Sequence, residues 1–220
     1  MVRGYFVTGT DTGVGKTVAS AALMHRLRSG GPIRYWKPIQ TGIETDDDTA
    51  TVERLGGCTA DEVWRPGVRL ERPVSPHLAA RLAGTRIDVA AVARLLPDDR
   101  SARWIVEGAG GALVPVNESE LMTDLMTRLA LPVIVVSRST LGTINHTLLT
   151  IEALRRRSLE VAGVIMAGPA NAENRLAIEQ YGHIHVIGEM PPLDPLTPDA
   201  LAAWVRTALD PRETLQEIAR

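Results

Sequence analysis

Short runs of apolar residues recur along the chain and alternate with segments in which apolar positions return every three or four residues. A continuous apolar run is typical of a strand buried on both faces of a parallel sheet, and the wider spacing is typical of an amphipathic helix. The runs predict strands at residues 4–8, 33–37, 103–107, 132–137, 161–166 and 184–187. The wider spacing predicts helices at residues 16–29, 76–83, 87–96, 120–129, 143–157, 172–181 and 198–208.

This alternation predicts an α/β fold with a doubly wound, mostly parallel sheet and helices on both faces. The segment 38–75 is rich in Gly, Pro, Thr and acidic residues, and we interpret it as a loop with a short helix, not as a linker between domains. We therefore expect a single domain over residues 1–220. Right-handed crossovers bring the carboxyl ends of the strands to one edge, so residues just after strands are the candidates for ligand binding.

The composition favours a small-molecule partner over nucleic acid or a membrane. A formal charge of -2 gives no field that would attract either, and aromatic residues make up only 4% of the chain, too few for a base-stacking platform. Cys58 is the single cysteine, which excludes an intrachain disulfide or a multi-cysteine metal cluster. Because no signal-like segment precedes the first strand and no long apolar run occurs, we expect a cytoplasmic protein.

A run of small residues ending in Gly-Lys-Thr, over residues 9–17, follows the first predicted strand and opens the first predicted helix. Backbone N–H groups in such a loop converge on a polyphosphate, while Lys16 supplies a charge and Thr17 a hydroxyl for Mg²⁺. Five residues instead of four separate Gly9 from Gly15, so we expect a slightly longer loop than the common form. The pattern predicts triphosphate chemistry, against the alternative of a glycine-rich turn that binds nothing.

A lysine and a hydroxyl follow the second predicted strand, at the edge where ligands are expected. Lys37 can neutralise a transferring phosphoryl group or a carboxylate-like anion, and Thr41 can hydrogen-bond a small polar substrate. The alternative is that Lys37 is a solvated lysine at the end of a strand.

Two carboxylates are candidates for the magnesium ion. Asp48 is the preferred donor within the acidic cluster 44–48, although such a cluster also suits a solvated helix N-terminus, where it complements the dipole. Glu107 ends a buried strand and precedes a second loop of small residues, 108–110, whose backbone can approach a ligand closely. The alternative for Glu107 is a simple turn after a strand.

Residues 139–146 open a helix after the fourth predicted strand, and free N–H groups there can bind a carboxylate. The alternative is ordinary capping of that helix by Ser139, Thr140 or Thr143.

Two histidines, His183 and His185, are predicted to face the same side of a strand. No third ligand accompanies them, so they do not indicate a zinc site. The chain shows no arrangement typical of a covalent nucleophile, which phosphoryl transfer does not require.

In their order and spacing, six motifs resemble those of dethiobiotin synthetase over nearly the whole chain. They are Thr8–Thr17, Lys37-Pro38 with Thr41-Gly42, Ser75–His77, Val106–Gly111, Leu141–His146 and Gly188–Pro191. The resemblance implies a P-loop NTPase-like ligase of biotin biosynthesis that depends on ATP and Mg²⁺ and works as a cytoplasmic homodimer. It also implies 7,8-diaminononanoate and CO₂ or bicarbonate as substrates, which react through a carbamate and a mixed anhydride with phosphate to form the ureido ring.

The resemblance assigns roles by position. Lys16 and Lys37 bracket the phosphoryl group and the carbamate as catalytic residues, and the ligands of Mg²⁺ are Thr17, Asp48 and Glu107. The residues placed around the nucleotide are Thr12, Gly13, Val14, Gly15, Lys16, Thr17, Asp48, Glu107, Gly108, Ala109, Gly110, Ala167, Gly168, Pro191, Pro192 and Leu193. The residues placed around the substrate are Thr41, near the carbamate or amines, and Gly142, Thr143, Ile144 and Asn145 of a second subunit, at the far carboxylate.

One motif departs from the family's pattern. Ala167-Gly168 stands where family members often carry Asn-Asp to read the adenine edge, while Pro191–Leu193 resembles the second base-contacting loop. We therefore expect looser discrimination, with other nucleoside triphosphates accepted besides ATP.

The main alternative is a nucleotide-driven switch of the partitioning or metal-insertase kind, which shares the fold and a related loop. Those loops typically carry an additional lysine early, and this chain has Asp11 at that position. A glutamine-dependent amidoligase is a third reading, which would need a glutaminase domain beyond these 220 residues.

Overall fold

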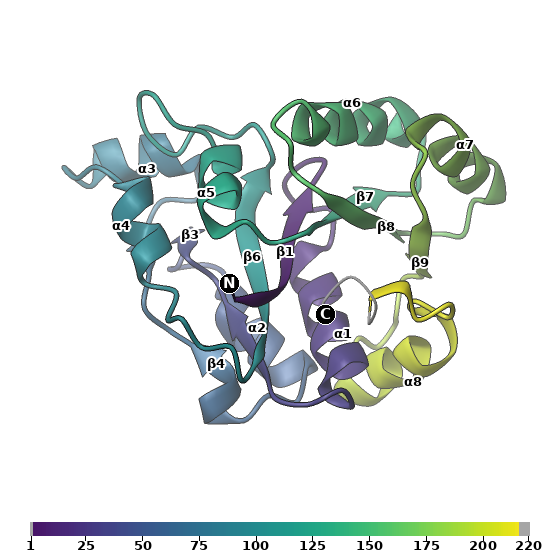
Figure 1. Ribbon diagram of the computed structural model, residues 1–220. Helices are drawn as coiled ribbons and strands as arrows, with labels where there is room; N and C mark the ends of the chain where they lie inside the picture. The colour runs from purple at the N-terminus through teal and green to yellow at the C-terminus, as the bar shows by residue number, and fades with distance from the viewer. Residues whose placement is uncertain (1, 216–220) are drawn as a thin grey trace.

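The computed structural model describes residues 2–215, which form an α/β fold around a seven-stranded parallel sheet (Figure 1). The order across this sheet is β4-β2-β6-β1-β7-β8-β9, and β3 pairs with β5 in a separate two-stranded sheet. The strands are β1 (Arg3–Gly9), β2 (Ile33–Trp36), β3 (Ile39–Thr41), β4 (Val63–Trp64), β5 (Val68–Leu70), β6 (Arg103–Gly111), β7 (Val133–Arg138), β8 (Val161–Ala167) and β9 (Val186–Met190). The helices are α1 (Lys16–Arg28), α2 (Asp48–Leu55), α3 (Pro76–Leu82), α4 (Val89–Arg94), α5 (Met122–Leu129), α6 (Thr143–Arg155), α7 (Ala172–Gly182) and α8 (Pro198–Ala208), with a 3₁₀ turn η1 (Ala60–Glu62).

Side chains alternate between the two faces of the main sheet, and each face packs against its own layer of helices. On β1, Tyr5 and Val7 join the core that contains residues of α1, α2 and α8, while Phe6 joins the core that contains residues of α3 to α7. Figure 1 shows α6 and α7 above the sheet and α1 and α8 below it. Because both faces are covered, the strands carry the continuous apolar runs seen in the sequence.

The structure confirms the predicted fold class, the six long strands and the seven helices, with bounds that shift by a few residues. The segment 38–75 contains the expected short helix, α2, together with β3, β4 and β5, which the sequence does not predict. Strands of two or three residues are too short to show a hydrophobic period. That residues 1–220 form a single domain remains our proposal.

The prediction that His183 and His185 lie on one strand is wrong. His183 follows α7 in the left-handed region with a φ of 45°, and its backbone N–H bonds to the carbonyl of Glu179. β9 begins only at Val186. A residue in the left-handed region commonly ends a helix, so His183 caps α7, and the strand begins three residues later.

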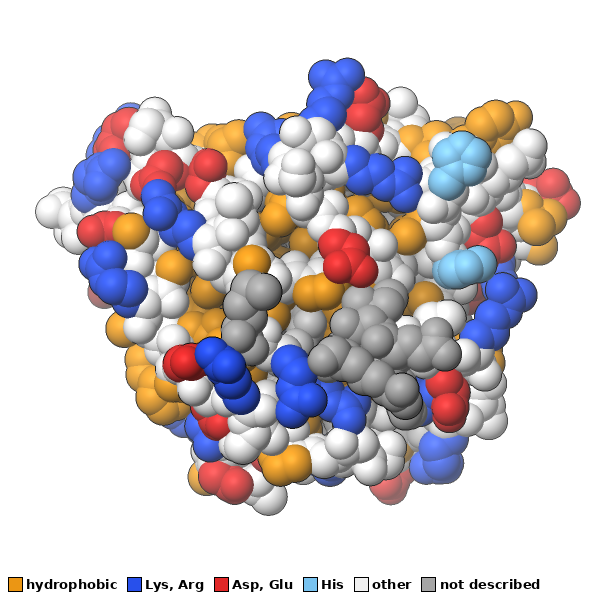
Figure 2. Space-filling model, in the orientation of Figure 1, with side chains coloured by type: hydrophobic (Ala, Val, Ile, Leu, Met, Phe, Trp, Pro, Cys, Tyr) orange, Lys and Arg blue, Asp and Glu red, His pale blue; other side chains and the backbone are white. Residues whose placement is uncertain are grey.

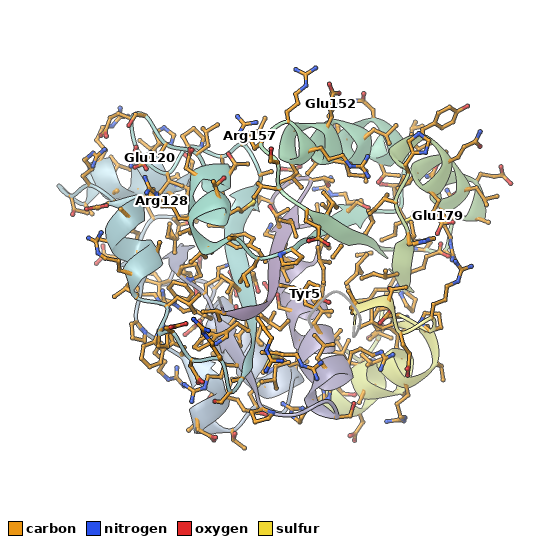
Figure 3. The ribbon with its side chains drawn as sticks, viewed as in Figure 1. Tyr5, Glu120, Arg128, Glu152, Arg157 and Glu179 are labelled. Atoms are coloured by element: carbon orange, nitrogen blue, oxygen red, sulfur yellow. The ribbon has the colours of Figure 1, made fainter. Side chains whose placement is uncertain are left out.

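Charges of both signs are mixed over the surface. Figure 2 shows blue and red side chains interspersed on one face, and Figure 3 labels one such pair, Arg128 and Glu120, whose charged groups lie 3.1 Å apart. Exposed pairs of this kind contribute little to stability. Within residues 2–215, no helix combines the length and the apolar character needed to cross a bilayer.

Cys58 follows α2, where its thiol donates to the carbonyl of Val52 at 3.6 Å. Burial raises the pKa of this thiol to about 11, against the opposing effect of the Arg28 guanidinium. Because the thiolate is the nucleophile, we expect alkylation of native Cys58 at pH 8 to be at least about tenfold slower than in the unfolded chain. Iodoacetamide labelling followed by intact-mass measurement gives both rates, and the native rate should still rise at pH 10. A plateau near pH 8.5 would contradict the burial argument.

Candidate active site

Three adjacent strand ends meet at one cavity on the carboxyl edge of the sheet. The strands β2, β6 and β1 are neighbours, and the cavity has a volume of about 710 Å³. Its walls come from the loop before α1, the residues after β2, the start of α2 and the end of β6. Of the predicted site residues, the structure brings to this cavity Thr12, Gly13, Gly15, Lys16, Thr17, Lys37, Thr41, Asp48, Glu107, Ala109 and Gly110.

The loop between β1 and α1 leaves the start of α1 open to a ligand. α1 begins after Gly15, whose φ of 93° lies in the left-handed region and which has no side chain to cap the helix. The Nζ of Lys16 donates to the carbonyl of Asp11 at 3.0 Å, so this side chain folds back over the loop. Burial, and then the nearby charge of Lys37, lower the pKa of Lys16. An anion in the cavity would supply the counter-charge that favours the ammonium form.

The ammonium of Lys37 lies between two carboxylates. Its Nζ is 2.6 Å from Oδ2 of Asp48 and 2.7 Å from Oε1 of Glu107, and it donates to the carbonyl of Gly108 at 3.1 Å. The hydroxyl of Thr17 lies 2.7 Å from Oδ1 of Asp48 and 3.1 Å from Oε1 of Glu107. Lys37 and Glu107 are 2% and 0% exposed, so the alternative of a solvated lysine at a strand end is wrong.

Local sequence explains how Asp48 and Lys37 reach each other. Asp47 caps α2, with its side chain accepting from the N–H of Ala50 at 3.1 Å, so Asp48 is the first residue of the helix. Arg69 on β5 donates to the carbonyl of Lys37 at 2.9 Å and fixes the backbone after β2. The acidic cluster therefore starts a helix and also contributes a carboxylate to the cavity.

Lys37 and Asp48 shift each other's pKa. Burial by itself would raise the pKa of Asp48, but the charge and hydrogen bond of Lys37 outweigh it and hold that pKa below its usual value. Burial likewise opposes the charged form of Lys37, and the carboxylates of Glu107 and Asp48 overcome it and raise the pKa of Lys37. Asp48, which is 23% exposed, and the buried Lys37 thus form an ion pair whose stability depends on both partners.

Tyr35 also contacts this group of charged side chains, although the sequence analysis does not single it out. It lies on β2, is 0% exposed, and donates its hydroxyl to Oε2 of Glu107 at 3.0 Å. The sequence does carry a signal for Tyr35. It lies two residues before Lys37, and alternate residues of a strand share one face.

The ends of β8 and β9 flank the phosphate loop. A Cβ added to Gly15 would lie 3.4 Å from the Cβ of Ala167 and 3.4 Å from the Cε of Met190. Gly168 and Pro191–Leu193 directly follow these strand ends. The predicted base-contacting residues therefore lie next to the cavity, beyond the loop and not within the cavity itself.

The start of α6 has no side-chain cap. Its N-cap is Gly142, with a φ of 93°, so the alternative of capping by a hydroxyl is wrong. The hydroxyl of Thr143 bonds instead to the carbonyl of Arg138. The N–H of Thr143 bonds to the carbonyl of Thr140 at 3.1 Å, which leaves the N–H groups of Ile144 and Asn145 open to a ligand.

Residues 142–145 do not line the cavity of about 710 Å³. A second hollow of about 410 Å³ joins His146 and Leu149 of α6 to residues 10–12 of the phosphate loop. Leu141, just before α6, is fully exposed, and Leu149 is 56% exposed.

The oxygens around Lys37 suit a magnesium ion. Hydroxyl and carboxylate oxygens are typical Mg²⁺ ligands. The carboxylates of Asp48 and Glu107 contact the ammonium of Lys37, and the hydroxyl of Thr17 contacts both carboxylates. Within residues 2–215, no group of three or more His, Cys, Asp or Glu side chains could hold a metal by itself. Two carboxylates and a hydroxyl form an incomplete shell, which phosphate oxygens and water would complete.

Comparison with known families and proteins identifies close relatives. Residues 3–200 match a family model described as AAA domain. The "ATP-dependent dethiobiotin synthetase BioD" of Paramagnetospirillum magneticum is 49% identical over 91% of this chain and 94% of its own length. The BioD protein of Rhodopseudomonas palustris strain CGA009 is 44% identical over 95% of both chains. The "Biotin biosynthesis bifunctional protein BioCD" of Bordetella avium is 47% identical over 92% of this chain, which spans 42% of that protein.

Solved structures with low sequence identity share the fold. The septum site-determining protein MinD from Pyrococcus horikoshii, complexed with Mg-ADP, aligns with a TM-score of 0.61 at 15% identity, covering 100% of this chain and 95% of its own. A ParA family ATPase from Chlorobium tepidum aligns with a TM-score of 0.58 at 10% identity, covering 100% of this chain and 97% of its own. These likenesses confirm a P-loop NTPase-like fold.

Replacing Lys37 by Met should destabilise the protein by about 3–5 kcal/mol near neutral pH, because Glu107 and Asp48 would lose their buried counter-ion. In the native protein the lowered pKa of Asp48 stabilises the fold above its unfolded pKa, and this contribution is lost as pH falls through the folded value. In Lys37→Met, burial still acts on Asp48 but Lys37 no longer opposes it. The pKa of Asp48 therefore rises, and protonation of Asp48 relieves part of the lost stability. Urea unfolding should therefore show a larger difference between the two proteins at pH 8 than at pH 5. An equal difference at both values would contradict this account.

Proposed function

The chain belongs to the family of ATP-dependent dethiobiotin synthetases. From this membership we propose that it closes the ureido ring of dethiobiotin from 7,8-diaminononanoate and CO₂, with cleavage of ATP to ADP and phosphate, in biotin biosynthesis. The observation that carries the proposal is the meeting of the phosphate loop, Lys37 and two carboxylates at one cavity, on neighbouring strand ends.

The proposed reaction has three steps. One amine of the substrate adds to CO₂ and loses a proton, which gives a carbamate. The carbamate oxygen takes the γ-phosphoryl group of ATP, which releases ADP and leaves a carbamic-phosphoric mixed anhydride. The neighbouring amine attacks the anhydride carbonyl, expels phosphate and loses a proton, and the ring closes.

The chain's own groups meet the charge demands of these steps. The loop before α1 binds the phosphates through its N–H groups, and Lys16 supplies the charge beside them. Lys37 lies opposite and stabilises the carbamate and the transferring group, since positioned charges are the main catalytic contribution in phosphoryl transfer. Thr41 lines the same cavity and hydrogen-bonds the carbamate or the amines.

Thr17, Asp48 and Glu107 would hold Mg²⁺, as the contacts among these three side chains beside the ammonium of Lys37 support. When bound, the ion neutralises the phosphate oxygens and offsets the charge that develops on the leaving group. Asp48, among the acidic residues 44–48, is the one whose carboxylate contacts Thr17 and Lys37.

We further propose a cytoplasmic homodimer in which residues 142–145 of a second subunit receive the far carboxylate of the diamine. Two observations support this arrangement: the uncapped N-terminus of α6, and the exposed leucines Leu141 and Leu149 around it.

An isotope experiment tests the proposed reaction. The protein is incubated with ATP, Mg²⁺, ¹³C-bicarbonate and 7,8-diaminononanoate, and the product is examined by mass spectrometry. We expect one ¹³C atom in a cyclic urea for each ADP released, and a loss on the order of 10²-fold or more in Glu107→Gln. Nucleotide hydrolysis that proceeds equally without the diamine and bicarbonate, with no labelled urea, would mark the protein as a nucleotide-driven switch instead.

Nucleotide discrimination should be weak. Gly168 has a φ of +133°, and a Cβ added there would lie 2.3 Å from Oγ of Ser139, so this position does not accept a base-reading side chain without rearrangement. We expect kcat/KM for ATP to exceed that for CTP or GTP by less than about a hundredfold, or about 2.7 kcal/mol. Steady-state kinetics with the three nucleotides measures the ratios. A larger preference for ATP would require a base-reading contact from elsewhere.

A further inference from the structure

We propose that Tyr35 is a positioning residue for Glu107, holding one carboxylate oxygen so that the other faces the cation of the site. The proposal rests on the proposed function, in which that cation is Mg²⁺ during turnover. Tyr35 lies outside the six motifs that carry the family resemblance.

The register of the sheet brings the two side chains together. Tyr35 on β2 pairs with Ile105 on β6, and Trp36 pairs with Val106. Because alternate residues share a face, Glu107 lies on the same face as Tyr35, one diagonal step along the neighbouring strand. Both side chains are 0% exposed, so water does not compete for their contact.

The hydrogen bonds divide the two oxygens of Glu107 between two kinds of partner. Oε1 receives the ammonium of Lys37 at 2.7 Å and the hydroxyl of Thr17 at 3.1 Å. Oε2 receives the hydroxyl of Tyr35 at 3.0 Å. The carboxylate plane is thereby fixed, with a single oxygen turned toward the cation.

The phenol is suited to this role because it stays a donor. A tyrosine hydroxyl in its ordinary, protonated form is a hydrogen-bond donor, and this one donates to Oε2 of Glu107. Without that hydroxyl, Oε2 would be a buried acceptor with no partner among residues 2–215, which is costly. The carboxylate would then rotate about a soft terminal torsion and share both oxygens with the cation.

The test compares Tyr35→Phe with a matched control. Tyr5→Phe also removes one buried tyrosine hydroxyl, which bonds to the carbonyl of Leu215. Tyr5 lies on β1 (Figure 3) and does not line the cavity. Mn²⁺ binding to each protein in the presence of ADP is measured by electron paramagnetic resonance, and folding is checked by circular dichroism. ADP binding in EDTA is measured in parallel.

We expect Tyr35→Phe to bind Mn²⁺ about 10- to 100-fold more weakly than the native protein, as is typical when a group that orients a metal ligand is lost. ADP binding without metal should change by less than about twofold, since Tyr35 acts on the metal ligand and not on the phosphate loop. Tyr5→Phe should keep the native Mn²⁺ affinity although it loses stability. Native Mn²⁺ affinity in folded Tyr35→Phe would overturn the proposal.

Metal selectivity distinguishes a positioning role from a packing defect, because a packing defect would not change it. Ca²⁺ accepts a bidentate carboxylate, whereas Mg²⁺ demands near-octahedral geometry. Competition against Mn²⁺ should therefore show a preference shifted toward Ca²⁺ in Tyr35→Phe and unchanged in Tyr5→Phe. An unchanged preference in both variants would count against the positioning role.

A measurement on the native sequence covers the case in which Tyr35→Phe does not fold. The chain has three tyrosines, at positions 5, 35 and 181, so 3-fluorotyrosine labelling gives three ¹⁹F signals, which Tyr5→Phe and Tyr181→Phe assign. Adding Mg²⁺ to the ADP complex should shift the Tyr35 signal and leave the Tyr5 signal in place. An unmoved Tyr35 signal would overturn the proposal. Failure of the native protein to bind Mn²⁺ with ADP would instead overturn the proposed function.

Discussion

A buried ammonium between two carboxylates is the interaction on which the rest of the site depends. Lys37 contacts both Asp48 and Glu107 at hydrogen-bonding distance, and Lys37 and Glu107 are both buried. Such a network is costly to desolvate and is retained where each charge has a partner. The same two carboxylates also accept from the hydroxyl of Thr17, and these are the three side chains that we propose as ligands of a divalent ion.

The sheet order makes this arrangement possible. Because β6 lies between β2 and β1, residues at the three strand ends face one another across about two strand spacings. Lys37 directly follows β2, Glu107 lies within β6, which continues past the predicted end of that strand to Gly111, and the phosphate loop follows β1. The two-stranded sheet of β3 and β5 supports the backbone after β2, through the contact of Arg69 with the carbonyl of Lys37.

The fold alone does not distinguish a ligase from a nucleotide-driven switch, since MinD and ParA proteins share it at 10% to 15% identity. The side chains at the cavity do distinguish them. The early part of the phosphate loop carries Asp11, which pairs with Arg138 at 3.6 Å. This position therefore has no lysine that could reach across a dimer. Lys37 and Thr41 line the edge of the cavity, where we propose that they contact the substrate.

The sequence by itself determined the long strands, the helices and the loop before α1, and it predicted Lys37, Asp48 and Glu107 as site residues, because hydrophobic period and residue chemistry are local properties. It did not determine β3, β4 and β5, which are too short to show a period, or the left-handed cap at His183. Only the tertiary structure decided that Lys37 is buried between two carboxylates and that Tyr35 holds the far oxygen of Glu107. The contacts of Tyr35 and Lys37 with Glu107 join residues about 70 positions apart through strand register, which depends on how whole strands pair.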